Sequence, residues 1–534
     1  MTAQGLFKQF DDRVCRIGWI LVALGIFIFV LDYMRSYIRL RHIPGPPAAA
    51  LTNLVRRSWV NTGNAHIIHT DLHRNYGTVV RFGPNAIMVS SPSAIEKIYG
   101  FKTRFQKSEF YDSIMPRMKG GKIPDVFATR DEGIHRRMRR PVANLYSLTN
   151  LMSFEPVMTS TMQHLFVRLD ELFLDKKVDV DLFQWIQYYM FDVLGQVTFS
   201  KELGFLDKGG DVEGVIENNW RYFSMVAANT QMPWLDRLWR DNPLIPVSAK
   251  KNPLVEFGAA RIRERMGLIE SGKGDLGQRD FLSSFIAENA KDRTLPAMFL
   301  PTWVNSNIVA GADTTSVLSG ALIYHLLKNP VSLTKLQREM DDATAAGRLS
   351  KFATWKESND LTYLDMCVKE ATRMHPPFSL PFERVVPGCG LEIDGYHIPP
   401  GTRIGIVRGF ASRFMAKLSK HVLVLTTRSD SSQNPWSLHR EASLYGAEPD
   451  LWRPERWLCD KEKHAAMYNT LLTFGAGHRS CLGKHLAYFE IYKLVPSLLQ
   501  RYNIQLVDRD EEWIVDNKWL VKPSGFRVRL SSRS

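Results

Sequence analysis

Ten residues near the C-terminus, Phe474 to Gly483, constrain this chain more than any other stretch. They read Phe-Gly-Ala-Gly-His-Arg-Ser-Cys-Leu-Gly, so a single cysteine, Cys481, follows a glycine-rich turn, and an apolar run from Leu486 to Leu499 comes next. Such a turn can direct backbone N–H groups toward the sulfur. Those donors, together with Arg479, favour a thiolate of the kind that binds iron. The alternative is a buried, inert cysteine, which is the commoner state of an arbitrary cysteine.

The loop contains the complete pattern F-x-x-G-x-R-x-C-x-G, formed by Phe474, Gly477, Arg479, Cys481 and Gly483. A match at every fixed position outweighs the alternative of an inert cysteine. The stretch resembles the haem-binding loop of the cytochrome P450 family, in which the cysteine is the proximal iron ligand. The resemblance implies haem b as the cofactor, Cys481 as its metal ligand, and the other four residues as part of the cofactor site.

Composition places the chain among ordinary globular proteins. Of its 534 residues 45% are hydrophobic and 23% are charged, and neither an internal repeat nor a long low-complexity linker divides it. The net charge of +14 favours an anionic membrane surface or an acidic protein partner over nucleic acid, because no compact basic stripe with interleaved aromatic residues is present. The cysteines are odd in number and form no C-x-x-C pair, which argues against disulfides and structural zinc: Cys15, Cys367, Cys389, Cys459 and Cys481.

An uncharged apolar run near the N-terminus, Ile17 to Leu31, predicts a single membrane-spanning helix. Arg35, Arg39 and Arg41 follow it, and this positive charge places the rest of the chain in the cytosol. A cleaved signal peptide is the alternative, but no small-residue cleavage site follows the run. The proline-rich break Ile43 to Pro47 comes next. Microsomal members of the resembled family share this order, which implies a single-pass protein of the endoplasmic reticulum membrane.

A strongly basic segment, Arg130 to Ala143, is helical in pattern. A solvated helix face is the usual interpretation of such a run. The resembled family instead carries a Trp-x-x-x-Arg pair here that binds the haem propionates, and His135 and Arg139 have this spacing with His in place of Trp. The resemblance therefore implies His135 and Arg139 as cofactor-binding residues. The surrounding arginines suit a face on which an acidic reductase docks.

The longest helical candidate runs from Pro301 to Pro330 and contains Ala-Gly-Ala-Asp-Thr-Thr at residues 310–315. Small residues let a flat group approach the backbone, and Thr hydroxyls can bond to the preceding turn, although small residues also serve helix packing. The segment is similar to the long distal helix of the resembled family. That resemblance implies that Thr314 hydrogen-bonds the bound oxygen and that Asp313 helps to relay protons to it.

A further helix, Leu361 to Met374, carries Glu370 and Arg373 on one face. An E-x-x-R pair alone is a weak signal, but it gains weight because Arg456 lies in a later Arg-Pro-Glu-Arg-Trp segment. The resemblance implies that Glu370, Arg373 and Arg456 form a buried structural network rather than a catalytic group. It also implies that Arg384 binds a haem propionate.

One segment departs from the pattern of the family. The 27 residues from Val407 to Gln433 are basic and rich in Ser and Thr, and they separate Gly401–Ile406 from the Trp436–Arg440 segment that the family pattern places directly after it. We hypothesise that residues 407–433 come from a retained intron, with a surface insertion as the alternative. Sequencing of the spliced transcript decides between the two.

Four segments are expected to wall a substrate pocket: residues 114–118, 307–310, 378–382 and 519–524. They are apolar enough for a lipophilic ligand. A fifth, Gln231 to Leu244, mixes Trp, Leu and Arg amphipathically and is either part of the core or a lid that dips into a membrane.

Together these features predict a mainly α-helical cytochrome P450 fold with small β-sheets. Residues 1–42 form the N-terminal transmembrane helix and its basic flank, and residues 43–534 form the catalytic domain. The resemblance implies a haem-thiolate monooxygenase that acts on a small lipophilic molecule of secondary metabolism, in the style of filamentous-fungal members such as pisatin demethylase. Electrons are expected from NADPH through a separate cytochrome P450 reductase, with cytochrome b5 as a second partner. The alternatives are a haem-thiolate isomerase or dehydratase that needs no reductase, and a haem protein inactivated by residues 407–433.

Overall fold

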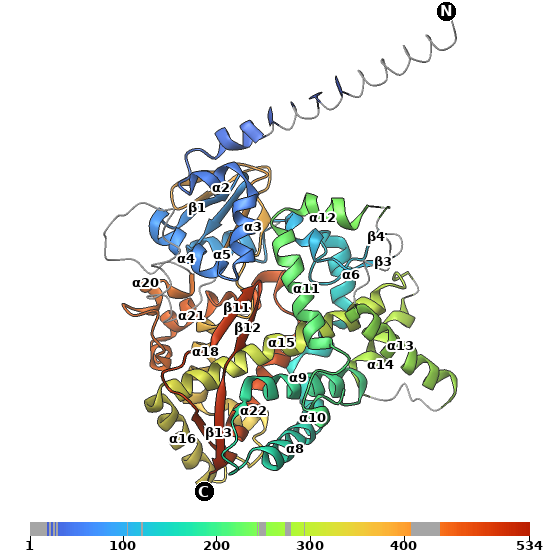
Figure 1. Ribbon diagram of the computed structural model, residues 1–534, viewed down its shortest axis with the longest axis vertical. Helices are drawn as coiled ribbons and strands as arrows, with labels where there is room; N and C mark the ends of the chain where they lie inside the picture. The colour runs from blue at the N-terminus through green and yellow to red at the C-terminus, as the bar shows by residue number, and fades with distance from the viewer. Residues whose placement is uncertain are drawn as a thin grey trace, which may run out of the picture.

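The chain forms a mainly helical body with several small β-sheets, and one long helix, α15, runs through its middle (Figure 1). This computed structural model describes residues 19–20, 23–24, 27, 30–31, 33–103, 105–118, 121–242, 244, 253–272, 279–292, 294–406 and 438–533. The predicted insertion at 407–433 lies outside the described residues, and so do many residues of the predicted anchor at 17–31. Within the described part of the chain, no helix combines the length and the apolar character that crossing a membrane requires.

The helices follow the apolar periodicity of the sequence, with boundaries set by caps and prolines. They are α2 (Pro47–Leu51), α3 (Asn53–Asn61), α4 (Ala65–Tyr76), α5 (Ser93–Tyr99), α6 (Glu132–Val142), α7 (Leu148–Leu151), α8 (Glu155–Leu172), α9 (Leu182–Phe199), α10 (Phe205–Lys208), α11 (Val215–Thr230), α12 (Pro233–Arg240), α13 (Pro253–Glu270), α14 (Phe281–Lys291), α15 (Phe299–Lys328), α16 (Pro330–Ala345), α17 (Trp355–Asn359), α18 (Thr362–Met374), α20 (Ala442–Tyr445), α21 (Lys461–Asn469) and α22 (Lys484–Arg501).

The helix expected between Pro301 and Pro330 is α15, and it begins two residues earlier, at Phe299. A proline in the first turn of a helix is tolerated because its missing N–H has no intrahelical partner there. α9 packs along α15, and a Cβ added at Gly311 would lie 3.0 Å from a methyl group of Leu194. The small residues of α15 therefore allow close helix packing at this point.

The strands make one four-stranded sheet, one three-stranded sheet and three two-stranded ribbons among the described residues. They are β1 (Val79–Gly83), β2 (Ala86–Val89), β3 (Arg117–Met118), β4 (Gly121–Lys122), β5 (Val180–Asp181), β6 (Arg384–Val385), β7 (Leu391–Ile393), β8 (Tyr396–Ile398), β9 (Arg403–Ile406), β10 (Tyr502–Leu506), β11 (Ile514–Lys518), β12 (Leu520–Ser524) and β13 (Arg527–Ser532).

The four-stranded sheet has the order β1-β2-β9-β6. β1 and β2 form a hairpin in which they pair antiparallel. β9 then pairs parallel with β2 and antiparallel with β6, which sets Arg384 opposite Ile404. Arg384 therefore lies on the edge strand of this sheet, and its side chain is buried.

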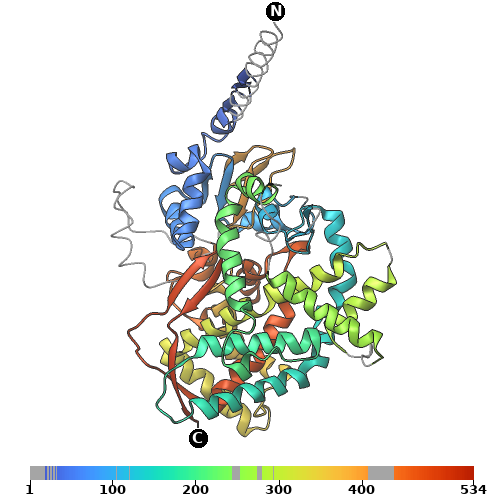
Figure 2. The same ribbon diagram turned by 45° about the vertical axis from the view of Figure 1, so that its right-hand side comes forward.

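The largest apolar core lies where α8, α9, α15 and α22 meet, and it includes Phe191, Leu322 and Leu494. The apolar run that follows the cysteine loop is part of α22, and its side chains from Phe489 to Leu499 are buried. The core therefore holds the cysteine loop and α15 in a fixed relation. Figure 2 shows the hairpin of β11 and β12 beside α11 and α15, against which β12 packs.

Two arginines fix the segment that follows the N-terminal residues to the first sheet. Arg81 of β1 donates a hydrogen bond to the carbonyl of Tyr37 over 3.1 Å. Arg39 donates to the carbonyl of Pro400 over 2.9 Å and to Asn85 Oδ1 over 2.7 Å. These contacts attach residues 37–39 to the sheet where the N-terminal segment leaves the body (Figure 1).

Candidate active site

The cysteine loop is a tight turn closed by its own backbone. The N–H of Cys481 donates to the carbonyl of Phe474 over 2.7 Å. Gly475 and Gly477 have φ values of 68° and 62°, in the left-handed region that favours glycine. A Cβ at Gly477 would lie 2.0 Å from the carbonyl oxygen of Tyr99, so no other residue fits there without moving the backbone.

The Cys481 side chain is exposed on the wall of a cavity, just before the N-terminus of the 18-residue helix α22. Although the sulfur is open to this cavity, the surrounding protein removes it from bulk water, and this burial raises the pKa of its thiol; the backbone N–H of Gly483 and the charges of Arg139 and Lys484 lower that pKa. The N-terminal end of a helix also favours a thiolate. The cations that act on this sulfur are therefore Arg139 and Lys484. The predicted charge, Arg479, pairs instead with Glu132 of α6 over 2.8 Å.

One cavity of about 270 Å³ connects the cysteine loop with α15 and the β11–β12 hairpin. Phe474, Cys481 and Gly483 line it from the loop, and Thr314 lines it from α15. The structure therefore brings the predicted thiolate and the predicted threonine to the same space. All four of the predicted pocket segments contribute at least one residue to its wall.

Thr314 and Asp313 face different surroundings although they are neighbours in sequence. The Thr314 hydroxyl donates to the carbonyl of Ala310 over 2.7 Å and lines the cavity. Asp313 is buried and does not line the cavity; its carboxylate accepts hydrogen bonds from Gln187 of α9 and Asn219 of α11. Burial raises the pKa of Asp313, and the two amides oppose this effect. The structure thus places Thr314 at the cavity and Asp313 among the helices behind it.

Basic side chains gather beside the cysteine loop. Arg139 donates to the carbonyl of Ser480 over 2.8 Å, and both Arg139 and His135 line the cavity. Burial, followed by the charge of Arg479, lowers the pKa of His135 to about 3, so its ring is neutral at physiological pH. Arg384 is buried nearby and donates to the Tyr111 hydroxyl over 3.2 Å, but it does not itself line the cavity.

One basic residue of this group, Lys107, was not predicted from the sequence. Its ammonium group is buried, donates to the carbonyl of Phe127 and lines the cavity. Burial and the charges of Arg384 and Arg479 hold the pKa of Lys107 well below its usual range. Lys107 lies between Gln106 and Ser108 in the sequence, and no pattern marks it there, because only the fold brings residue 107 beside residues 384 and 479.

This cluster fits the carboxylate groups of a haem. Nη1 of Arg479 is buried without a hydrogen-bond partner among the described residues, although Arg479 lines the cavity. An unpaired buried donor is costly, and a carboxylate is the acceptor that suits a guanidinium best. Lys107, His135, Arg139 and Arg384 lie around the same group. The residues present therefore match a cofactor with a thiolate-binding metal and anionic side groups.

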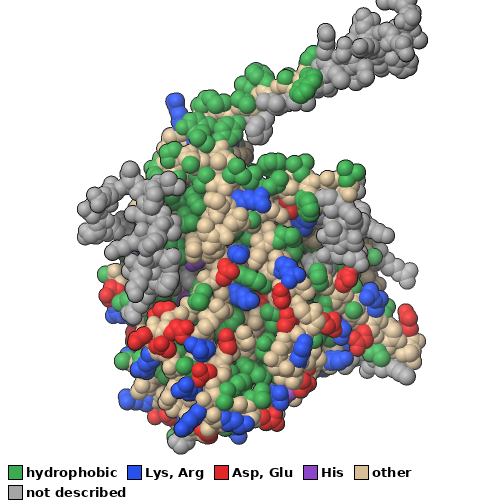
Figure 3. Space-filling model, viewed as in Figure 1, with side chains coloured by type: hydrophobic (Ala, Val, Ile, Leu, Met, Phe, Trp, Pro, Cys, Tyr) green, Lys and Arg blue, Asp and Glu red, His purple; other side chains and the backbone are tan. Residues whose placement is uncertain are grey.

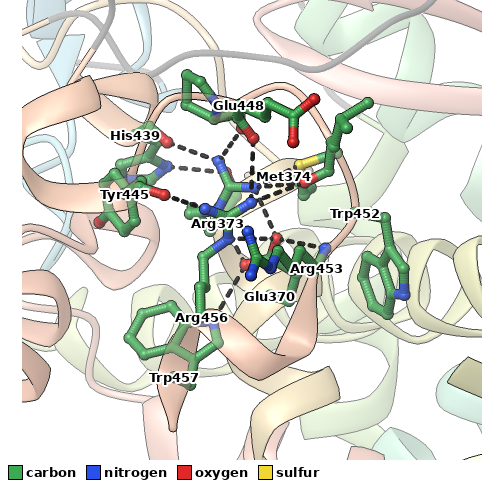
Figure 4. A network of polar contacts seen from close by, with 12 residues as sticks. Glu370, Arg373, Met374, His439, Tyr445, Glu448, Trp452, Arg453, Arg456 and Trp457 are labelled. Carbon is green, nitrogen blue, oxygen red and sulfur yellow. Dashed lines mark hydrogen bonds and ion pairs between the residues drawn. The ribbon is translucent and has the colours of Figure 1, made fainter. Parts of the chain in front are cut away.

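The predicted structural triad forms a closed network behind the loop (Figure 4). Glu370 of α18 accepts from Arg373 over 2.7 Å and from Arg456 over 2.9 Å. Arg373 also donates to the carbonyl of His439, and the indole of Trp457 donates to Glu370 over 3.0 Å. The Glu370 and Arg373 side chains have no exposed surface, and the arginines keep the pKa of Glu370 low although burial opposes them. None of the three residues lines the cavity.

The family model for cytochrome P450 matches residues 44–412 and 431–530 of this chain. The chain belongs to the cytochrome P450 family. The two matched blocks cover both the cysteine loop and the long helix α15. The interval between them, residues 413–430, falls inside the segment that the sequence marked as a departure from the family pattern.

Relatives of this cytochrome P450 are found in filamentous fungi. It is 52% identical to "Cytochrome P450 monooxygenase cicH" of Emericella nidulans over 96% of this chain and 99% of that protein. It is 44% identical to a "Cytochrome P450 monooxygenase" of Aspergillus terreus over 91% of this chain and 94% of that protein. With "Cytochrome P450 monooxygenase pkfB" of Emericella nidulans the identity is 37%, over 97% and 96% of the two chains. The chain is thus a cytochrome P450 monooxygenase, an oxidoreductase that incorporates molecular oxygen, with a haem-thiolate iron centre.

Proposed function

We propose that this cytochrome P450 inserts one atom of dioxygen into a lipophilic small molecule of fungal secondary metabolism, by hydroxylation, epoxidation or demethylation. The observation that carries the proposal is the shared cavity, in which Cys481 faces a space also lined by Thr314, by apolar side chains of α15 and by Trp519 of the β11–β12 turn. The fungal monooxygenases similar to this chain support the same class of reaction.

The haem, when bound, supplies the redox chemistry that activates dioxygen. Cys481 holds its metal, and the basic group around Arg479 and Lys107 holds its carboxylates. The Thr314 hydroxyl can pass a proton into the cavity, provided that it releases the carbonyl of Ala310. Asp313, bonded to two amides away from the cavity, fixes the rotation of α15 and acts on the reaction only through that position.

Electrons reach the site from NADPH through a separate reductase in this proposal, with cytochrome b5 as an additional donor. The surface beside the cysteine loop supports it. α6 contacts the loop through Arg139 and Ser480, and it exposes Arg136, Arg137 and Arg140 to solvent. Such a surface suits the acidic face of a redox partner.

We place the chain at the endoplasmic reticulum membrane, with the catalytic body in the cytosol. The described N-terminal residues expose large apolar side chains, among them Trp19, Ile20 and Phe27 at 74%, 64% and 58%. On α12, Trp234 and Trp239 are 52% and 60% exposed. Figure 3 shows hydrophobic side chains gathered at the end of the molecule from which the N-terminal segment leaves. Exposed apolar surface of this kind supports contact with a lipid bilayer.

The test uses the full chain expressed in a fungal host. The reduced protein with carbon monoxide should absorb at about 450 nm rather than about 420 nm, and Cys481→Ala should abolish that band. In a host grown under isotopically labelled dioxygen, metabolites that require the intact chain should gain one labelled oxygen atom. Products that form without NADPH and without labelled oxygen would instead support an isomerase or dehydratase.

A further inference from the structure

Trp519 occupies a strained position on the wall of the cavity. It is the one residue between β11 and β12, which pair antiparallel up to Lys518 and Leu520, and its φ is 79°. A bulky aromatic residue with a positive φ is a genuine outlier, because its Cβ is crowded by the backbone. The turn is held from both sides: the carbonyl of Trp519 accepts from the N–H of Ser379, and Phe378 bridges to Leu520.

The indole N–H of Trp519 adds a second energetic cost to the backbone strain. The side chain has no exposed surface, and its Nε1 has no hydrogen-bond partner among the described residues. A buried indole N–H normally finds an acceptor. Strain and an unsatisfied donor at one residue of a cavity wall are the features expected where a ligand completes the site.

The side chains around this indole are aromatic. The rings of Phe378, Phe223 and Phe127 lie 5.2, 5.4 and 5.9 Å from that of Trp519, centroid to centroid. All three also line the cavity, and Phe127 is 37% exposed. The planes of Phe378, Phe223 and Phe127 lie at 42°, 69° and 37° to the plane of Trp519, so the group offers both edges and faces. A flat aromatic molecule gains from such contacts beyond the burial of its apolar area, whereas a saturated one does not.

We propose that this cavity selects a flat aromatic substrate that carries a hydrogen-bond acceptor, and that the acceptor is recognised by the indole N–H of Trp519. The inference rests on the proposed function, since it names the substrate class of the same cavity. Trp519 here determines specificity and takes no part in the oxygen chemistry. Because the Nε1 atom is not exposed, the ligand reaches it by displacing an adjacent side chain, and Phe127 is the neighbouring ring with the most exposed surface.

The test compares three probes on the haem-loaded full chain by equilibrium dialysis. 2-Acetylnaphthalene is flat and carries a carbonyl acceptor, 2-ethylnaphthalene has the same skeleton without the acceptor, and 2-acetyldecahydronaphthalene keeps the acceptor without the aromatic rings. The wild-type protein should bind 2-acetylnaphthalene about five- to tenfold more tightly than either of the others. Equal affinity for all three probes would overturn the inference with the wild-type protein alone.

Two variants separate the donor from the aromatic wall. Trp519→Phe removes the N–H and keeps a ring, so the preference for the ketone over 2-ethylnaphthalene should fall to about twofold or less. Phe127→Leu keeps the indole, so it should weaken both naphthalenes while leaving their ratio unchanged. If Trp519→Phe retained the wild-type ratio, the N–H would be satisfied by a neighbouring ring and the inference would be wrong. Dialysis measures binding whatever the turnover, whereas a missing band at about 450 nm would count against the proposed function only.

Discussion

At the scale of single residues, Lys107 is the clearest example of a site residue that only the folded structure reveals. Its buried ammonium group lies with Arg384 and Arg479, whose charges lower its pKa, and the described carboxyls that oppose them are those of Asp125 and Glu132. Without an anionic ligand these three cations repel one another. With the carboxylates of a haem beside them, the same charges become counter-ions.

Replacing Lys107 with Met should therefore weaken haem binding without destabilising the haem-free protein. Haem transfer to apomyoglobin should be about tenfold faster than from the wild type, because one charge-assisted contact is lost. The urea midpoint of the haem-free protein should stay the same or rise, because repulsion is relieved. Lys356→Met, at an exposed lysine of α17, is the matched control and should change neither quantity. An unchanged transfer rate in Lys107→Met would refute the role of Lys107.

A glycine of the cysteine loop gives a second test at this scale. A Cβ at Gly477 meets the carbonyl of Tyr99 at 2.0 Å, whereas a Cβ at Gly267 on α13, away from the cavity, meets no atom within 4 Å. Gly477→Ala should therefore distort the loop and shift the carbon monoxide band from about 450 to about 420 nm, while the control Gly267→Ala should keep the wild-type spectrum. The same spectrum in both variants would show that the loop tolerates a moved backbone.

At the scale of elements, the packing of α18 against the 453–457 segment depends on one buried charge network. Glu370 is fully buried between Arg373 and Arg456, and it also accepts from the indole of Trp457. The network stabilises the protein only as a unit, because each member is stranded once its partner is removed.

Glu370→Ala should lower the free energy of unfolding by about 3–5 kcal/mol, since it leaves two arginines without their carboxylate. The matched control is Glu217→Ala on α11, where Glu217 and Arg221 are 69% and 72% exposed. That variant should cost less than about 1 kcal/mol. Urea denaturation of both variants measures the difference, and equal losses would contradict a structural role for the triad.

At the scale of the whole molecule, buried titratable groups set the pH range of stability. Burial lowers the pKa of His69 to about 3 and that of His73 to about 4, from 6.5. It raises the pKa of Glu490 on α22 from 4.5 to about 8. Between pH 4 and pH 6.5 both histidines are protonated in the unfolded chain but neutral in the folded chain, so their contribution to stability rises with pH. Between 4.5 and 8 the folded chain keeps a proton on Glu490 that the unfolded chain releases, so this group lowers stability as pH rises.

Urea midpoints measured across that range should therefore climb up to about pH 6.5 and then fall toward pH 8. His73→Asn should flatten the climb, and Glu490→Gln should remove the fall; each group is worth about 1.4 kcal/mol per pH unit within its window. A fall of the same slope in Glu490→Gln would show that another group is responsible.

The residues that the family model leaves unmatched, 413–430, bear on the length of the mature chain. We expect the spliced transcript to lack the 27 codons for residues 407–433, which overlap the unmatched residues 413–430. A chain that joins Ile406 to Asn434 should fold and bind haem with a band at about 450 nm. Transcript reads that span the segment would establish it as an insertion.

Local patterns in the sequence were enough to predict the cysteine loop and α15, because each depends on spacing within one short segment. The Glu370 network was implied by the resemblance to the family, since Arg456 lies 86 residues from Glu370 and the Glu370–Arg373 spacing alone is a weak signal. The facing of Asp313 was not predictable, because successive residues of a helix differ by about 100° and only the partners Gln187 and Asn219 decide which one meets the cavity. Arg479 was expected at the sulfur and pairs with Glu132 instead, since α6 approaches the loop from elsewhere in the chain. Lys107 and Trp519 depend in the same way on contacts between distant segments.

The hydrogen bonds of Arg39 and Arg81 affect how the catalytic body is oriented relative to the N-terminal segment. They tie residues 37–39 to the first sheet, and that sheet carries β6 and the residues that lead into the cavity wall. These hydrogen bonds restrain rotation of the catalytic body relative to residues 37–39. A surface that binds the chain at residues 37–39 therefore also orients the first sheet, and with it the side of the enzyme from which a substrate arrives.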